Sequence, residues 1–191
     1  MKSFPKAVFP ALCALLLTAV LSGCSGGDKR TVRIGHNQAA DHPTNLALLA
    51  FEEYIEGALG DKYDVEVYPS ELLGSQTDMV QLTQTGAIDF CVASNSILET
   101  FSRNYTLFNL PYLFVSSEAY HQAMDDPDIT GPIFESTRQA GFQAVTWIDA
   151  GTRNFYTVDT PIESPADLKG LKIRVQQSPT NVAMMSLLGG S

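Results

Sequence analysis

The alternation of strand-type and helix-type patterns over residues 31–93 constrains the fold of this chain most. Strand-type segments have apolar side chains at every second position or in a short unbroken run, and helix-type segments have them at intervals of three and four. Because strands joined through helices cross over with one hand, the alternation predicts an α/β fold with a mostly parallel sheet. The predicted strands are residues 31–35, 63–68 and 88–93, and the predicted helices are residues 45–59 and 75–85.

Two details of this pattern predict what is buried. Leu46, Leu49 and Tyr54 fall at helical spacing in the first helix, so we expect this stripe to face the core although Glu53 interrupts it. Residues 88–93 are apolar enough for a strand buried on both faces. Residues 101–114 are rich in aromatic side chains. We expect these side chains to lie in the core, and the alternative is a surface that a partner covers. Later predicted elements are helices 117–124, 131–140 and 181–188, and a strand over residues 142–148.

Polar loops follow the three predicted strands of the first sheet. Ligands of open parallel sheets bind outside the carboxyl ends of the strands. Residues 36–38, 70–76 and 94–96 occupy these positions and are rich in neutral hydrogen-bonding groups. The loops contain no glycine-rich phosphate motif.

Two arginines stand out in residues 147–181, on strand-like runs on either side of a turn-rich connector. Arg153 and Arg174 each offer a planar, permanently charged fork that binds a carboxylate through two parallel hydrogen bonds. Two such forks from neighbouring runs predict a carboxylate clamp. The alternative is that both are solvated surface arginines, as most charged side chains are.

The formal net charge of −9 excludes nucleic acid as a partner, because no basic patch exists to neutralise phosphates. Binding an anion to so acidic a chain requires locally focused positive charge. The scarcity of arginines therefore draws attention to Arg153 and Arg174.

The N-terminus is predicted to be a lipoprotein signal over residues 1–23. Lys2 and Lys6 form a basic start, the apolar run that follows is short for a membrane span, and residues 21–24 (LSGC) match the lipobox. Cys24 is therefore the expected lipidation site, with residues 24–30 as a tether. The alternative is an ordinary signal peptide with an incidental cysteine. Cys91 remains as the one cysteine expected in the body of the chain, which excludes an intramolecular disulfide.

The sequence supplies no set of catalytic groups. No Gly-x-Ser-x-Gly motif occurs, and the spacing of His36 and His42 matches no zinc motif. We therefore expect no enzyme activity, no metal and no cofactor. A secreted hydrolase is the alternative from another class, and it would need a nucleophile–base pair that is missing.

The ordered motifs of the body resemble those of the solute-binding proteins of TRAP transporters, the DctP-like family. The resemblance runs along almost the whole chain after the signal. It rests on residues 35–37 (GHN), 68–74 (YPSELLG), 86–90 (GAIDF), 110–114 (LPYLF), 151–153 (GTR) and 168–175 (LKGLKIRV).

The resemblance implies a periplasmic-binding-protein-like fold of two α/β domains that close on an organic acid. It assigns the carboxylate clamp to Arg174, a second cleft arginine to Arg153, and ligand contacts to Asn37, Ser94 and Gln177. Some relatives carry an acidic residue at the position of Ser94, so the serine argues against a sialic-acid-type ligand. The expected domains are residues 31–148 and a second, incomplete domain over residues 149–191.

The resemblance further implies an extracytoplasmic, lipid-anchored protein that delivers an organic acid to membrane permease subunits. A solute receptor for an ABC importer or a sensor is the alternative. Family chains continue well beyond the segment that corresponds to residues 181–191, so the sequence is interpreted as incomplete at its C-terminus.

Overall fold

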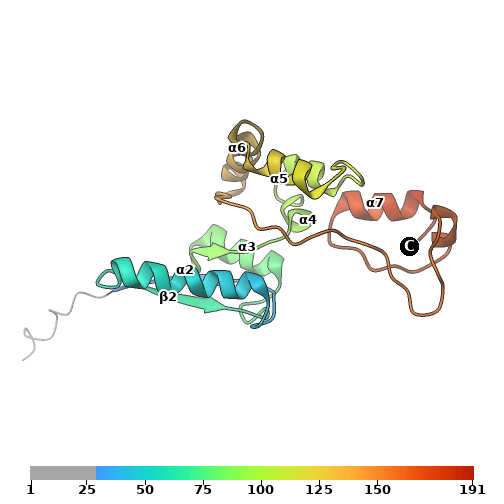
Figure 1. The fold of residues 1–191 in the computed structure, drawn as a ribbon. Coiled ribbons are helices and arrows are strands. Elements are labelled where there is room, and N and C mark those ends of the chain that lie inside the picture. Colours follow the sequence, from blue (N-terminus) through green and yellow to red (C-terminus); the bar gives the residue numbers. More distant parts are fainter. Residues whose placement is uncertain (1–28) are drawn as a thin grey trace, which may run out of the picture.

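The computed structural model describes residues 29–191, and a three-stranded parallel sheet lies with α2 (Pro43–Leu59) and α3 (Gln76–Thr85) at one end of it (Figure 1). The strands are β1 (Arg30–Gly35), β2 (Tyr63–Tyr68) and β3 (Phe90–Cys91), in the order β2-β1-β3. Val32 lies opposite Val65, and Ile34 lies opposite both Val67 and Phe90. The predicted parallel α/β sheet is therefore confirmed.

Two helices connect these strands. Helix α2 (Pro43–Leu59) begins at His42, whose Nδ1 accepts a hydrogen bond from the Thr44 amide, and ends at Gly60. Helix α3 (Gln76–Thr85) begins with a capping box between Ser75 and Asp78, and ends at Gly86, whose φ of 73° a glycine adopts readily. The helix ends predicted at residues 59 and 85 are thus confirmed.

The predicted apolar stripe of α2 is wrong. Leu46 and Tyr54 are 54% and 73% exposed, and Leu49 is exposed as well. The side of α2 that packs carries buried Asn45 and half-buried residues one and two turns later. Apolar residues occur around most of this helix, so periodicity does not decide which face is buried.

Strand β3 is shorter than predicted and is not buried on both faces. Ile88 is buried, but Phe90 is 42% exposed. The physical reason is position, because β3 pairs only with β1 among the described residues and lies at the edge of the sheet.

The remaining helices lie beyond the sheet and are mostly short. Figure 1 shows α5 and α6 together on one side and α7 near the C-terminus, with a long extended run between them. None of the described helices is long and apolar enough to span a bilayer. The elements are α4 (Asn95–Leu98), η1 (Arg103–Asn109), α5 (Ser117–Asp125), α6 (Pro127–Glu135), η2 (Ser136–Ala140), η3 (Pro165–Leu168) and α7 (Pro179–Leu187).

Three later predictions need correction. Helix α6 starts at Pro127 and gives way to the 3-10 helix η2, where one helix over residues 131–140 was expected. Residues 142–148 form no strand, because a strand requires a backbone partner and the Ala144 amide donates to the Thr137 hydroxyl instead. In the aromatic segment Tyr105 is buried, as a core segment requires, but Tyr112 is 97% exposed.

Tyr105 leads to a stability prediction. Its ring packs on Phe108 with centroids 5.8 Å apart, burial raises the pKa of the phenol to about 12, and its hydroxyl has no hydrogen-bond partner in the described part of the chain. Tyr105→Phe removes only this unpaired hydroxyl, so we expect the free energy of unfolding to stay equal or rise by up to about 1 kcal/mol. Urea unfolding measures this, and a loss above about 1 kcal/mol would mean that the hydroxyl is bonded.

Candidate functional site

The three loops that follow the strands meet at the carboxyl edge of the sheet. The Ser70 amide donates to the Gln38 carbonyl at 2.9 Å, and the Glu71 amide donates to the His36 carbonyl at 3.1 Å. The Ser94 amide donates to Gln76 Oε1 at 2.6 Å. The predicted convergence of the loops is therefore confirmed by direct hydrogen bonds.

His36 fixes the loop that contains Asn37. Its imidazole is fully buried, with Nε2 2.9 Å from Asn45 Oδ1, and its Nδ1 accepts the Gln38 amide at 3.2 Å. This arrangement requires the proton on Nε2, since Nδ1 accepts. Asn37 is half-buried on the loop so formed, beside the place where the chain turns from β1 towards α2.

Residues that follow Arg174, the predicted clamp residue, reach the same edge of the sheet. The Thr77 hydroxyl donates to Gln177 Oε1 at 3.2 Å, and the Ser96 hydroxyl lies 2.6 Å from Gln176 Oε1. Residue Ser94, half-buried next to these contacts, has a buried hydroxyl with no partner among the described residues. The structure thus brings Ser94 and Gln177 to the loops that follow the strands.

Arg153 and Arg174 are exposed, and neither makes a hydrogen bond or ion pair within residues 29–191. Nearby protein atoms partly desolvate Arg153, which lowers the pKa of its guanidinium. The structure shows no direct contact between the two arginines. The strand-like runs that carry them are not strands, although residues 171–173 exchange backbone hydrogen bonds with Ser191.

Three other arginines have acidic partners. Arg30 pairs with Asp89 at 3.0 Å, Arg33 with Glu66 at 3.6 Å and Arg138 with Glu135 at 2.6 Å. Like Arg103 and the described lysines, Arg153 and Arg174 have no carboxylate partner within residues 29–191, so their guanidinium groups are open to an anion from solution.

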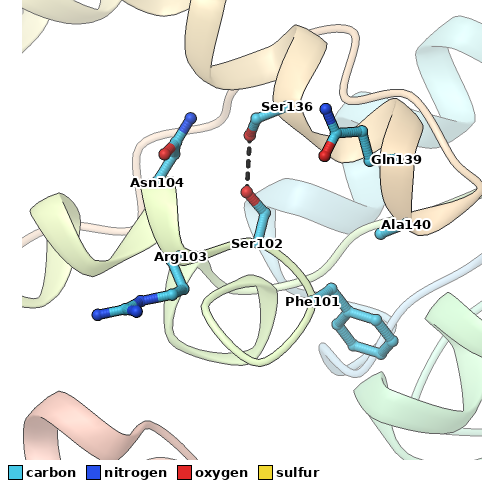
Figure 2. A pocket seen from close by; sticks show the side chains of 7 residues that line it. All are labelled: Phe101, Ser102, Arg103, Asn104, Ser136, Gln139 and Ala140. Carbon is cyan, nitrogen blue, oxygen red and sulfur yellow. Dashed lines mark hydrogen bonds between the residues drawn. The ribbon is translucent and has the colours of Figure 1, made fainter.

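A pocket lies elsewhere, between η1 and η2, and no predicted site residue lines it (Figure 2). The pocket has a volume of about 470 Å³, and the Ser102 and Ser136 hydroxyls in its lining share a hydrogen bond of 2.7 Å. Figure 2 shows the Arg103 guanidinium pointing away from Ser136 and Gln139. Arg103, the one cation among the lining residues, therefore does not face the polar side chains of the pocket. This pocket is a weaker candidate for an anion site.

Metal and thiol chemistry find no support in the described residues. No group of three histidine, cysteine or acidic side chains there lies close enough to hold a metal. Burial raises the pKa of the Cys91 thiol, which disfavours the reactive thiolate. Cys24, the predicted lipidation site, lies outside the described residues, as does the predicted signal.

Comparison with known proteins gives consistent matches. A family model described as bacterial extracellular solute-binding protein, family 7, matches residues 34–191. An uncharacterized Salmonella typhimurium protein, YiiZ, is 38% identical over 183 residues, which are 96% of this chain and 55% of that protein.

Solved structures agree with this match. The TRAP periplasmic solute-binding protein of Anaerococcus prevotii with bound D-glucuronate is 72% identical over 85% of this chain and 53% of that chain, with a TM-score of 0.84. That of Xanthobacter autotrophicus with bound β-D-galacturonate is 34% identical over 84% of this chain and 53% of that chain, with a TM-score of 0.78. The chain spans about half the length of the relatives it matches.

Proposed function

Since the chain belongs to the bacterial extracellular solute-binding protein family 7, whose members bind solutes and are not enzymes, we propose that it captures a sugar acid for a TRAP-type transporter. The family match confirms the resemblance predicted from the sequence motifs. A hexuronate is the ligand class that fits best, and the observation that carries this choice is the 72% identity to a protein with bound D-glucuronate.

Charge at the candidate site supports an acidic ligand. Arg174 supplies the main carboxylate clamp and Arg153 a second cation, and both are free of acidic partners within the described residues. A guanidinium meets a carboxylate through two parallel hydrogen bonds, a geometry that an ammonium does not offer. Arg153 is exposed, so an anion from solution can reach its guanidinium.

Neutral groups at the loops suit the hydroxyls of a sugar acid. Asn37, Ser94 and Gln177 contribute amide and hydroxyl groups, which both donate and accept hydrogen bonds. The buried Ser94 hydroxyl without a partner is a polar atom that a ligand or water satisfies. In this proposal the ligand lies between a domain of residues 31–148 and a second domain that starts at residue 149.

A thermal-shift panel tests the ligand class. Because the relatives are about twice as long, the protein used is residues 24–191 continued by the part of the Anaerococcus prevotii protein that lies beyond its match, here called the extended chain. A ligand at 100 times its Kd stabilises the folded state by about 2.7 kcal/mol. We expect D-glucuronate and D-galacturonate to raise the melting temperature and glucose to leave it unchanged. Equal shifts for all three would refute recognition of the acid group.

Delivery of the ligand to membrane permease subunits completes the proposed function and places the protein outside the cytoplasm. A lipid on Cys24 would hold the protein at the membrane surface. We expect intact-mass measurement on membrane-extracted protein to show an N-terminus at Cys24 that carries a diacylglyceryl group, because residues 21–24 match the lipobox. An unmodified N-terminus at any other residue would exclude the anchor.

A further inference from the structure

Glu99 is a buried carboxylate that sequence reasoning did not single out. Glu99 directly follows α4 and is only 8% exposed. Its carboxylate lies against the start of α7. Burying a charge is costly unless hydrogen bonds replace its water. The hydrogen-bond partners of Glu99 therefore decide whether its burial destabilises the fold or stabilises a contact.

Four side chains donate to the Glu99 carboxylate. Oε1 accepts the Thr180 hydroxyl at 2.6 Å and the Thr106 hydroxyl at 3.3 Å. Oε2 accepts the Ser178 hydroxyl and the Asn109 amide, the latter at 2.9 Å. Desolvation acts to raise the pKa of Glu99, but the bonds from Ser178, Thr180 and Thr106 outweigh it, and the pKa is lowered. The site therefore favours the charged form.

These donors come from two distant parts of the chain. Thr106 and Asn109 lie on η1, a few residues after Glu99, whereas Ser178 and Thr180 lie at the start of α7, about 80 residues later. Ser178 is also the N-cap of α7, since its hydroxyl accepts the Asn181 amide at 3.1 Å. A negative charge beside the first turn of a helix is further stabilised by the helix dipole.

Further bonds join the same two parts of the chain. Ser96 contacts Gln176 at 2.6 Å and accepts the Asn181 side-chain amide at 3.3 Å. Residues 176–181 follow the run that carries Arg174 without any intervening element. Whatever fixes these residues also fixes where that run ends.

We propose that Glu99 is a positioning residue that anchors residues 176–181 to the part of the chain that carries the sheet. Its charge holds Ser178 and Thr180, and through them it sets the direction in which the chain leaves Arg174 and Gln177. The anchor itself depends only on the contacts above, whereas its effect on ligand binding rests on the proposed function.

Hydrogen exchange on the chain without ligand tests the anchor. Glu99→Gln keeps the size of the side chain but turns an amide N–H₂ towards groups that themselves donate. We expect amide exchange in residues 180–187 to accelerate about tenfold or more, with β1 and β2 unchanged. The control is Glu53→Gln on the exposed face of α2, which we expect to change neither region. Unchanged exchange in α7 of the Glu99→Gln variant would overturn the proposal.

A double-mutant cycle separates anchoring from a general loss of structure. Thr180→Val removes one donor at nearly constant size. If Glu99 acts through Thr180, the exchange effects of Glu99→Gln and Thr180→Val must be non-additive. Additive effects would overturn a direct role.

The ligand arm uses the extended chain and D-glucuronate. We expect Glu99→Gln to raise the Kd about tenfold while the urea midpoint of the sheet region stays unchanged. If the unmodified extended chain bound no sugar acid, the proposed function would fail, and the exchange data on α7 would still decide the role of Glu99. An unchanged Kd in a chain that does bind would refute positioning of the clamp.

Discussion

Arg174→Ala in the extended chain should weaken D-glucuronate binding by roughly tenfold to a hundredfold or more. A hydrogen bond to a charged group contributes about 1.5–3 kcal/mol, so losing one bond already weakens binding by about tenfold to a hundredfold, and the clamp makes two. Arg174 makes no bond within residues 29–191 that would need to be replaced, so the substitution should leave folding intact. Calorimetric titration measures the change in Kd.

Two further variants sharpen this result. Arg174→Lys keeps the charge but not the fork, so we expect only part of the affinity to return. Arg138→Ala removes an exposed arginine that pairs with Glu135 elsewhere on the chain, and controls for the loss of one positive charge. Equal weakening by Arg138→Ala would reduce the effect of Arg174 to long-range charge, and an unchanged Kd in Arg174→Ala would exclude the clamp.

His36→Leu should lower the free energy of unfolding by about 2–4 kcal/mol. The side chain is fully buried, and it bonds Asn45 on one side and the Gln38 amide on the other. Leucine fills most of the space but leaves Asn45 Oδ1 buried without a partner, which costs about 1–3 kcal/mol in addition to the lost bonds. Urea unfolding should show a lower midpoint at unchanged slope.

His121→Ala is the matched control for this prediction. His121 also bonds a polar partner, Asp149 at 2.7 Å, but both side chains are partly exposed. Exposed pairs contribute little, so we expect a change below about 1 kcal/mol. If His36→Leu were as mild as this control, the loop around Asn37 would not depend on the buried imidazole.

Local rules were enough to predict the sheet and the place of the site. Val32, Val65 and Ile34 follow strand patterns, and Gly60 and Gly86 mark helix ends, so chain topology follows from neighbouring residues. Parallel strands place their carboxyl ends at one edge, which is why the loops with Asn37 and Ser94 converge as predicted.

Features that depend on distant partners were missed. The buried face of α2 is chosen by contact with β2, for example through Glu56 and the Val65 amide at 2.9 Å, and not by the apolar period. Residues 142–148 look like a strand but have no ladder partner in the described chain. The Glu99 contact joins residues 79 positions apart, and its only local signal is a lone acidic residue after an apolar pair.

The central claim is that this chain recognises the acid group of a sugar acid through its unpaired arginines. Calorimetric titration of the extended chain with D-glucuronate and with D-glucuronamide tests it most directly, because the two ligands differ only in carboxylate against neutral amide. We expect glucuronate to bind at least about tenfold more tightly, and this difference to shrink in the Arg174→Ala variant. Equal affinity for the two ligands, or binding of neither, would contradict the claim.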